Sequence, residues 1–306
     1  MPAAKRVLSI QSHVVHGYVG NRCAVFPLQL LGFDVDFVNT VQFSNHTGYP
    51  SWKGQIMDGN QLWEIVEGLQ TNGLLYYDYL ISGYIGSASL LKTIASLVEL
   101  LRKQNADLTY ICDPVMGDHE RLYVSPDLVP LYVENIVALA SIITPNQFEA
   151  EKLLGRKIRT EQEAVAACQE LHSRGPHTVV ITSFHPEGAE DHLLVIASTT
   201  LPQEEGMPST LRMQIPRSKA YFTGTGDLTV VLLLANLDKH TGQLKTAVER
   251  SLASLQGILQ ATVKAAGDAA FATVRDAKVA KQRELRLIEN QHLLKDAPIQ
   301  YKAVAL

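Results

Sequence analysis

Short apolar runs alternate with longer amphipathic segments along most of the chain. Runs of strand length lie at residues 6–10, 35–41, 79–82, 108–112, 141–144 and 178–181. Between them, apolar residues at helical spacing predict helices over 21–31, 58–69, 88–104, 129–139 and 160–174. Strands that alternate with helices in this way form βαβ units, in which the strands pair in parallel. The pattern therefore predicts an α/β fold built on a mostly parallel sheet.

The pattern changes after residue 190. From 191 to 215 the helical period is lost, and two β-like runs flank a loop of Pro, Glu and Gly, which predicts antiparallel strands at a sheet edge. Long helices are predicted over 225–237 and 244–266, and a polar terminal helix over 284–292. No internal repeat or long linker divides the sequence, so we expect residues 1–306 to form one domain.

Composition and charge narrow the class of partner. The chain has 306 residues, with 27 Lys and Arg against 31 Asp and Glu, and a net charge of −4. This balance gives no electrostatic reason to bind nucleic acid or an anionic membrane. The most apolar run, 230–235, is too short to span a bilayer, and the N-terminal residues lack the apolar core of a signal peptide. Three scattered cysteines indicate a reducing compartment, so we expect a soluble, cytoplasmic protein.

Polar residues recur where the predicted strands end. Ligands of open α/β sheets bind outside the carboxyl ends of the strands, so five residues are candidates for a binding site: Ser12, Asp113, Thr144, Thr182 and Ser183. Polar residues that simply begin loops would explain any one of them. That explanation accounts less well for the Asp-Pro and Thr-Pro-Asn strand ends, each of which is followed five residues later by an acid, Asp118 and Glu149.

The strongest local signal is the sequence FTGTGDL at 222–228, directly before an apolar helix. Gly224 and Gly226 let the backbone turn, and a helix N-terminus supplies unpaired N–H groups for an anion. Asp227 has two interpretations: a helix-stabilising acid, worth typically 0.3–1 kcal/mol, or a general base facing a substrate hydroxyl. The turn is not a Walker A loop. The first turn, with only Gly17 and Gly20, lacks the dinucleotide fingerprint, which argues against a dehydrogenase.

A hard cation is a further candidate ligand. Asp113, Asp118 and Glu149 could surround Mg²⁺, which is usually held by one or two carboxylates and by substrate phosphates. The alternative is that they are solvated loop acids, and this alternative fits Asp118 best, because it lies beside His119, Glu120 and Arg121. Three histidines lie in predicted turns without the spacing of metal ligands, and we interpret them as turn or pocket residues: His13, His16 and His46. Four aromatic residues could line a pocket or pack in the core: Phe43, Tyr49, Trp52 and Tyr84.

Five segments occur in an order that is typical of one known family. They are VLSIQSHVVHGYVGNRCAVFPLQLLG, VQFSNHTGY, CDPVMGD, ITPNQFEAE and GTGD, which extend from Val7 to Asp227. Together they resemble the pyridoxal kinase family of the ribokinase-like superfamily. The resemblance implies a three-layer α/β/α fold with a mostly parallel central sheet and antiparallel edge strands. It also implies ATP-dependent phosphorylation of the 5′-hydroxymethyl group of pyridoxal, pyridoxine or pyridoxamine in vitamin B6 salvage.

The resemblance also implies roles for individual residues. Asp227 would be the base, and the turn of Gly224, Thr225 and Gly226 would be the anion hole. The vitamer would contact Ser12, Val19, Phe43, His46, Thr47, Tyr84 and Asp227. ATP would contact Asp113, Asn146, Glu149, Thr182, Ser183 and Gly224. Asp118 and Glu149 would hold Mg²⁺, and a K⁺ or Na⁺ ion would bind Asp113, Thr144 and Thr182. The resemblance further implies a cytosolic homodimer.

Two alternatives stay open at this point. A hydroxymethylpyrimidine kinase shares the fold and the GTGD turn, but the SNHTGY segment at 44–49 argues against it. A catalytically silent B6-binding protein would not need Asp227, the glycines of the turn and the acids for Mg²⁺, all of which are present.

Overall fold

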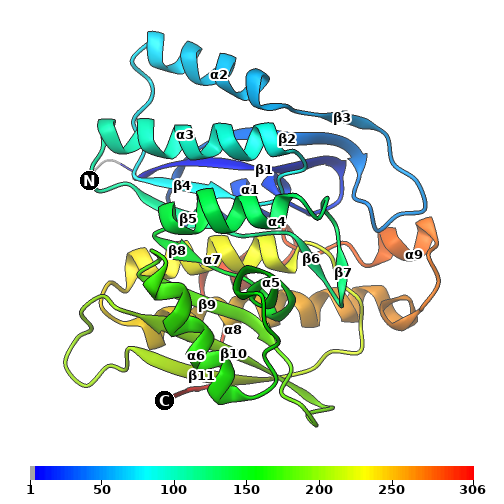
Figure 1. Cartoon of the computed structure of the whole chain (residues 1–306). Coiled ribbons are helices and arrows are strands. Elements are labelled where there is room, and N and C mark those ends of the chain that lie inside the picture. The colour runs from blue at the N-terminus through cyan, green and yellow to red at the C-terminus, as the bar shows by residue number, and fades with distance from the viewer. Residues whose placement is uncertain (1–3) are drawn as a thin grey trace.

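A single ten-stranded sheet organises the computed structural model, which describes residues 4–306 (Figure 1). Its order is β12-β11-β10-β9-β8-β5-β4-β1-β2-β3. The parallel strands are β1 (Arg6–His16), β2 (Asp34–Asn45), β4 (Tyr79–Ser82), β5 (Thr109–Cys112), β8 (Ile142–Ile143) and β9 (Thr178–Phe184). The antiparallel strands are β3 (Gly54–Ile56) at one edge and β10 (His192–Thr199), β11 (Thr210–Pro216) and β12 (Ala303–Ala305) at the other. The predicted mostly parallel sheet with antiparallel edges is confirmed.

Helices cover both faces of the sheet. One face packs against α2 (Gly59–Thr71), α3 (Ala88–Gln104), α4 (Leu128–Leu131), α5 (Gln147–Leu154) and α6 (Glu161–Ser173). The other packs against α1 (Asn21–Leu30), α7 (Thr225–Lys239), α8 (Leu244–Ala266) and α10 (Gln291–Lys295). In Figure 1 helices α3, α5 and α6 lie in front of the sheet, whereas α7 and α8 lie behind it. The fold is therefore the expected three-layer α/β/α arrangement of ribokinase-like proteins.

The central strands are apolar on both faces because each face meets a helical layer. Alternate residues of a strand point to opposite sides. Leu80 accordingly joins the core under α3, while its neighbour Ile81 joins the core under α7 and α8. Helix α7 is buried along most of its length, which explains the apolar run at 230–235. No helix within residues 4–306 has the length and apolar character to span a membrane.

The strongly periodic segments match their predicted bounds, and others differ. The strand at 79–82 and the helices at 88–104 and 244–266 have the bounds expected. Strands β1 and β2 run further than predicted, to His16 and Asn45. The helix predicted over 129–139 is divided into α4, a π-helical turn at Tyr132–Ile136 and a 3₁₀ turn at Val137–Leu139.

The predicted terminal helix at 284–292 is wrong. Irregular chain and turns connect α9 (Ala277–Gln282) to α10, which begins only at Gln291. Leu285 and Leu287 are both buried. Two residues that are two positions apart project from different sides of a helix, so a helix could not bury both against one surface.

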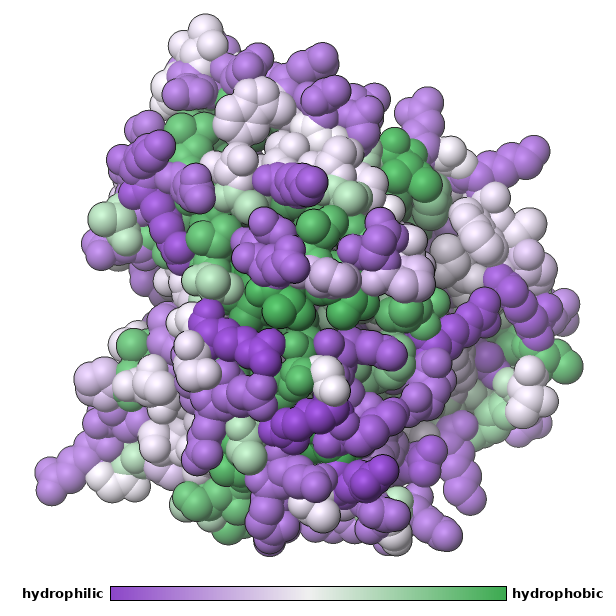
Figure 2. Space-filling model, in the orientation of Figure 1, coloured by the Kyte–Doolittle hydropathy of each residue, from purple (hydrophilic) through white to green (hydrophobic). Residues whose placement is uncertain are grey.

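The outer face of the α2–α6 layer is mostly hydrophilic, with one apolar band (Figure 2). Figure 2 shows hydrophilic side chains over most of this side of the molecule, with apolar side chains gathered in a band across its middle.

The three cysteines, Cys23, Cys112 and Cys168, are buried and free, as their scattered positions predict.

Candidate active site

The candidate residues gather at the carboxyl ends of the parallel strands. Asp113 directly follows β5, and Thr144 directly follows β8. Ser12 was expected after the first strand and Thr182 and Ser183 after the strand that ends at 181, but all three lie inside strands, because β1 and β9 are longer than predicted. Ser12 lies where the β1–β2 register shifts. Such a bulge redirects a side chain, as often happens next to active sites.

The Gly-rich turn forms the N-terminus of α7. Gly224 is the N-cap, with a left-handed φ of 78°. A Cβ atom at this position would overlap the Tyr18 carbonyl oxygen, so both the backbone angle and the close approach require glycine. The turn exposes the first backbone N–H groups of α7, those of Thr225, Gly226 and Asp227, which have no acceptor within the helix. These amides can bind an anion such as a phosphate.

Asp227 faces the turn at 17–20 across the site. Its Oδ2 accepts the Gly20 N–H at 2.8 Å. A Cβ at Gly20 would overlap Ser12, so Gly20 lies in contact with both Ser12 and Asp227. Among residues 4–306 no hydrogen bond to Oδ1 is formed, which leaves this oxygen free to accept a proton. Burial raises the pKa of Asp227, while the Gly20 N–H lowers it. A buried carboxylate with a free oxygen at this turn suits the general base that the sequence predicts, and that role stays a prediction.

One more carboxyl group, that of Asp113, lies next to this turn. Asp113 is buried, and its Oδ2 is 3.7 Å from the place where a Cβ of Gly226 would be. Thr144 Oγ1 lies 3.5 Å from Asp113 Oδ1. Burial, and then repulsion from Glu149 and Asp227, raise the pKa of Asp113 well above its usual range. Like charges brought together in a buried site favour either a proton or a bound cation.

Glu149 is fixed by the N-terminus of α5. Its Oε2 accepts the Asn146 N–H at 2.9 Å, and its Oε1 accepts the Met116 N–H at 3.0 Å. Asn146 returns the contact by accepting the Glu149 N–H at 2.9 Å, which completes a capping box. Burial raises the pKa of Glu149 to about 8 despite these hydrogen bonds. The spacing Asn-x-x-Glu is a sequence signal for this helix start, and our sequence analysis missed both the signal and α5.

The raised pKa of Glu149 predicts a particular dependence of stability on pH. The folded protein keeps this proton to about pH 8, whereas an ordinary Glu releases it near 4.5. Between these values the folded state binds more protons than the unfolded state, so stability falls as the pH rises. In magnesium-free buffer, the Tm of the wild type minus the Tm of Glu149→Gln should shrink by about 2 °C or more from pH 5 to pH 8. If the Tm values of the wild type and of Glu149→Gln change with pH in parallel, the raised pKa of Glu149 is contradicted.

Asp118 lies at the edge of this group. It ends β6 (Gly117–Asp118), which pairs with β7 (Arg121–Leu122) in a hairpin (Figure 1). Asn146 Nδ2 donates to the Gly117 carbonyl at 2.8 Å and anchors the hairpin. The Asp118 charge contributes to the raised pKa of Glu149, so the two acids are within electrostatic reach. Within residues 4–306, no three His, Cys, Asp or Glu side chains gather as a set of metal ligands.

Apart from Asp227, the residues predicted to surround a vitamer come from the first 84 positions. His46 is buried, and its Nε2 lies 3.2 Å from the hydroxyl of Thr223, the residue before Gly224. Tyr84 follows β4 and is half-buried, which raises its pKa. Thr47 differs from the others because its side chain is exposed, and its carbonyl accepts from Arg275 Nη2 at 2.8 Å. Phe43 and Val19 are half-buried, in β2 and in the 17–20 turn.

The remaining predicted nucleotide contacts lie beside the acids. Thr182 N donates to the Pro145 carbonyl at 3.0 Å, which brings the end of β9 next to the end of β8. Ser183 is the next residue of β9 and is half-buried. The positions of these residues agree with a common site, and their roles stay predictions.

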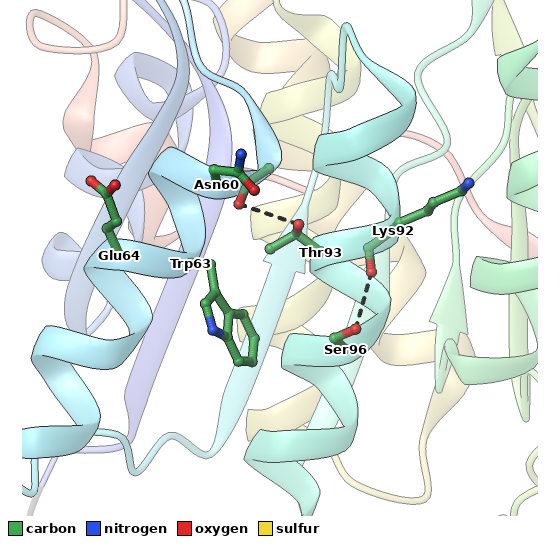
Figure 3. Close-up of a pocket in the computed structure, with 7 residues that line it drawn as sticks. Asn60, Trp63, Glu64, Lys92, Thr93 and Ser96 are labelled. Carbon is green, nitrogen blue, oxygen red and sulfur yellow. Dashed lines mark hydrogen bonds between the residues drawn. The ribbon is translucent and has the colours of Figure 1, made fainter.

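A separate groove of about 370 Å³ lies between α2 and α3 (Figure 3). Thr93 Oγ1 donates to the Gly59 carbonyl at 3.2 Å where the two helices approach each other. The groove is lined by Gly59, Asn60, Trp63, Glu64, Lys92, Thr93 and Ser96. None of the candidate site residues is among them, so this groove is distinct from the site at the strand ends.

A three-layer α/β/α fold in which a helix N-terminus and a carboxylate meet at the strand ends is typical of ribokinase-like kinases of small molecules. Comparisons with known proteins identify the particular kinase family. The pyridoxal kinase of Arabidopsis thaliana is 48% identical over 299 residues, which cover 97% of this chain and 94% of that protein. The Homo sapiens pyridoxal kinase is 46% identical over 310 residues, which cover 98% of each chain. This chain therefore belongs to the pyridoxal kinase family.

Solved structures and a family model agree with this assignment. A pyridoxal kinase from Leishmania donovani in complex with ADP and pyridoxamine matches with a TM-score of 0.87 and 37% identity, over 99% of both chains. A further structure of that enzyme contains ADP and pyridoxine. A family model described as phosphomethylpyrimidine kinase matches residues 79–271. The model leaves out the first 78 residues, which carry most of the predicted vitamer contacts.

Proposed function

We propose that this protein transfers the γ-phosphoryl group of ATP to the 5′-hydroxymethyl group of pyridoxal, and also of pyridoxine and pyridoxamine, giving the 5′-phosphate and ADP. The observation that carries the proposal is the free oxygen of Asp227 beside the exposed amides of the Gly224 turn. The named activity of relatives that are 46–48% identical over nearly the full chain supports the substrate. The ADP and vitamer complexes of the Leishmania donovani enzyme support both binding partners.

The chemistry asks mainly for positioning and for charge stabilisation. In the proposed step the vitamer hydroxyl oxygen forms a bond to the γ-phosphorus as the bond from that phosphorus to the β,γ-bridging oxygen breaks. Asp227 accepts the hydroxyl proton, and the N–H groups of 225–227 bind the phosphoryl oxygens. Ser12, Val19, Phe43, His46, Thr47 and Tyr84 surround the vitamer, and Asn146, Thr182 and Ser183 contact ATP.

The acids at the strand ends fit bound cations. Asp113 is buried near Asp227, and repulsion from the buried Glu149 and from Asp227 helps to raise the pKa of Asp113, which a positive ion would reverse. We assign Mg²⁺ to Asp118 and Glu149, and a K⁺ or Na⁺ ion to Asp113, Thr144 and Thr182. Bound there with the nucleotide, these cations would neutralise phosphate charge.

The direct test is formation of pyridoxal 5′-phosphate from pyridoxal and MgATP, with K⁺ and Na⁺ compared as the monovalent ion. Hydroxymethylpyrimidine serves as the competing substrate, because a hydroxymethylpyrimidine kinase is the alternative that the sequence leaves open, and the matching family model is described by a related pyrimidine. We expect the value of kcat/KM to be higher for pyridoxal. Turnover of the pyrimidine alone would assign the protein to the pyrimidine kinases, and pyridoxal binding without turnover of either substrate would indicate a silent binding protein.

We further propose a cytoplasmic homodimer. Three buried free cysteines fit a reducing compartment. The neighbouring strands β1, β2 and β3 carry exposed apolar side chains at Val15, Phe37 and Ile56, and such residues are candidates for a subunit interface. Light scattering after gel filtration should give twice the chain mass, and Phe37→Glu with Val15→Glu should reduce it to one chain. A wild type that stays monomeric at micromolar concentration would contradict the dimer.

A further inference from the structure

A buried acid from the C-terminal part of the chain lies beside the vitamer residues. Glu284, in the segment between α9 and α10, is 5% exposed. Its carboxylate has three partners from the first 49 residues: the Tyr18 N–H at 2.9 Å, the Tyr49 hydroxyl at 2.9 Å and His46 Nε2 at 3.1 Å. A buried carboxylate is costly unless hydrogen bonds compensate for the lost water. Here those bonds connect positions more than 230 residues apart.

These partners belong to the two turns that carry predicted vitamer contacts. Tyr18 precedes Val19 and Gly20, and Gly20 holds Asp227 through its N–H. His46 and Tyr49 enclose Thr47. Gly17 has a φ of 104°, and a Cβ there would overlap the Glu284 carboxylate, so the 17–20 turn is shaped around this acid.

The hydrogen bonds define the state of each partner. His46 Nδ1 accepts the Gly48 N–H at 3.1 Å, which assigns the ring proton to Nε2, the atom that faces Glu284 Oε1. Burial and the nearby Glu284 charge raise the pKa of Tyr49, so its hydroxyl stays a donor. Burial alone would raise the pKa of Glu284, but the hydrogen bonds from His46, Tyr18 and Tyr49 lower it overall. The acid is therefore ionised and accepts from all three groups.

We propose that Glu284 is a positioning residue for the vitamer: its carboxylate holds the 17–20 turn and the 46–49 turn together, in the arrangement in which both contact the substrate ring. The inference rests on the proposed function, because the vitamer contacts define what is positioned. Glu284 itself makes no hydrogen bond to the phosphate turn or to the nucleotide residues, and it reaches that turn only through His46, which contacts Thr223, and through Tyr18, which contacts Gly224. Its loss should therefore weaken vitamer binding much more than ATP binding.

The test replaces the carboxylate with an amide of the same shape. Glu284→Gln puts an N–H group opposite one of the three donors, and we expect the pyridoxal Kd, measured by calorimetry without ATP, to rise about tenfold or more. The KM for pyridoxal should rise in parallel, and the KM for ATP should stay within about twofold. Glu249→Gln is the matched control: Glu249 is also 5% exposed and accepts the Ala303 N–H at 2.8 Å, but it lies on α8, away from the site. Its vitamer Kd should not change.

Several outcomes would overturn the inference. One is an unchanged pyridoxal Kd in Glu284→Gln, and another is an equal rise in Glu249→Gln, which would show a general loss of folded protein. If Glu284→Gln does not fold, Tyr49→Phe removes one of the three donors and should raise the Kd about threefold; no rise would overturn the proposal. A wild type that binds pyridoxal but forms no product would refute the kinase activity alone, since the Kd comparison remains valid. A wild type that binds no pyridoxal would overturn both.

Discussion

Replacing Asp227 by asparagine should lower kcat by about 10²–10⁴ while changing the KM for pyridoxal and for ATP much less. Asparagine keeps the shape of the side chain, and its oxygen can still accept the Gly20 N–H that Asp227 Oδ2 accepts at 2.8 Å. What is lost is the proton acceptor beside the α7 amides. Steady-state formation of pyridoxal 5′-phosphate, with pyridoxal and ATP varied separately, measures the effect.

The alternative role of Asp227, as an acid that stabilises the N-terminus of α7, predicts a different result. Loss of that interaction costs typically 0.3–1 kcal/mol of stability and leaves the chemical step intact. Asp58→Asn is the matched control, because Asp58 caps α2 by accepting the Gln61 N–H at 3.0 Å, away from the site. Similar small effects of the two substitutions on Tm, with a kcat loss only in Asp227→Asn, would support the base. Near-normal kcat in Asp227→Asn would remove Asp227 from that role.

The sequence predicts best those parts of the fold whose information is local. Helices α3 and α8 match their predicted bounds because their apolar stripes are long and regular. The turn before α7 can also be predicted, since Gly224, Gly226 and Asp227 lie within four positions and a helix start depends only on neighbouring residues. Strand lengths are less predictable, because β1 and β9 continue through the polar residues Ser12 and Thr182, where pairing with neighbouring strands decides the end.

The contacts that join distant segments are the part that the sequence does not reveal. In the sequence, Glu284 is one acidic residue in a polar segment. Its contacts with Tyr18 and His46 form only when the chain folds. The same holds for the Gly20 N–H, which reaches Asp227 across 207 positions. The family resemblance supplies candidate roles for residues in quoted motifs. Glu284 lies outside those motifs, so neither local pattern nor resemblance identified it.

Replacing Gly224 by alanine should abolish most of the activity, with a loss in kcat/KM of at least about 100-fold. Alanine is disfavoured at the left-handed φ of 78°, and its Cβ would overlap the Tyr18 carbonyl, so the turn has to move away from the 17–20 segment. That movement displaces the α7 amides from the phosphoryl group and breaks the alignment of Asp227 with Gly20. Since one fixed oxyanion donor alone contributes about 10²–10³ in kcat in other enzymes, displacing several should have an effect at least as large.

A second glycine separates backbone strain from this loss of contact. Gly155, which ends α5, has a left-handed φ of 69°, and a Cβ there meets no atom within 4 Å. Gly155→Ala should cost roughly 1 kcal/mol through the backbone alone and leave kcat/KM unchanged. Gly224→Ala should lose more stability in urea titrations and, in addition, nearly all activity. Equal effects of the two substitutions on kcat/KM would mean that strain, and not the position of the α7 amides, limits the reaction.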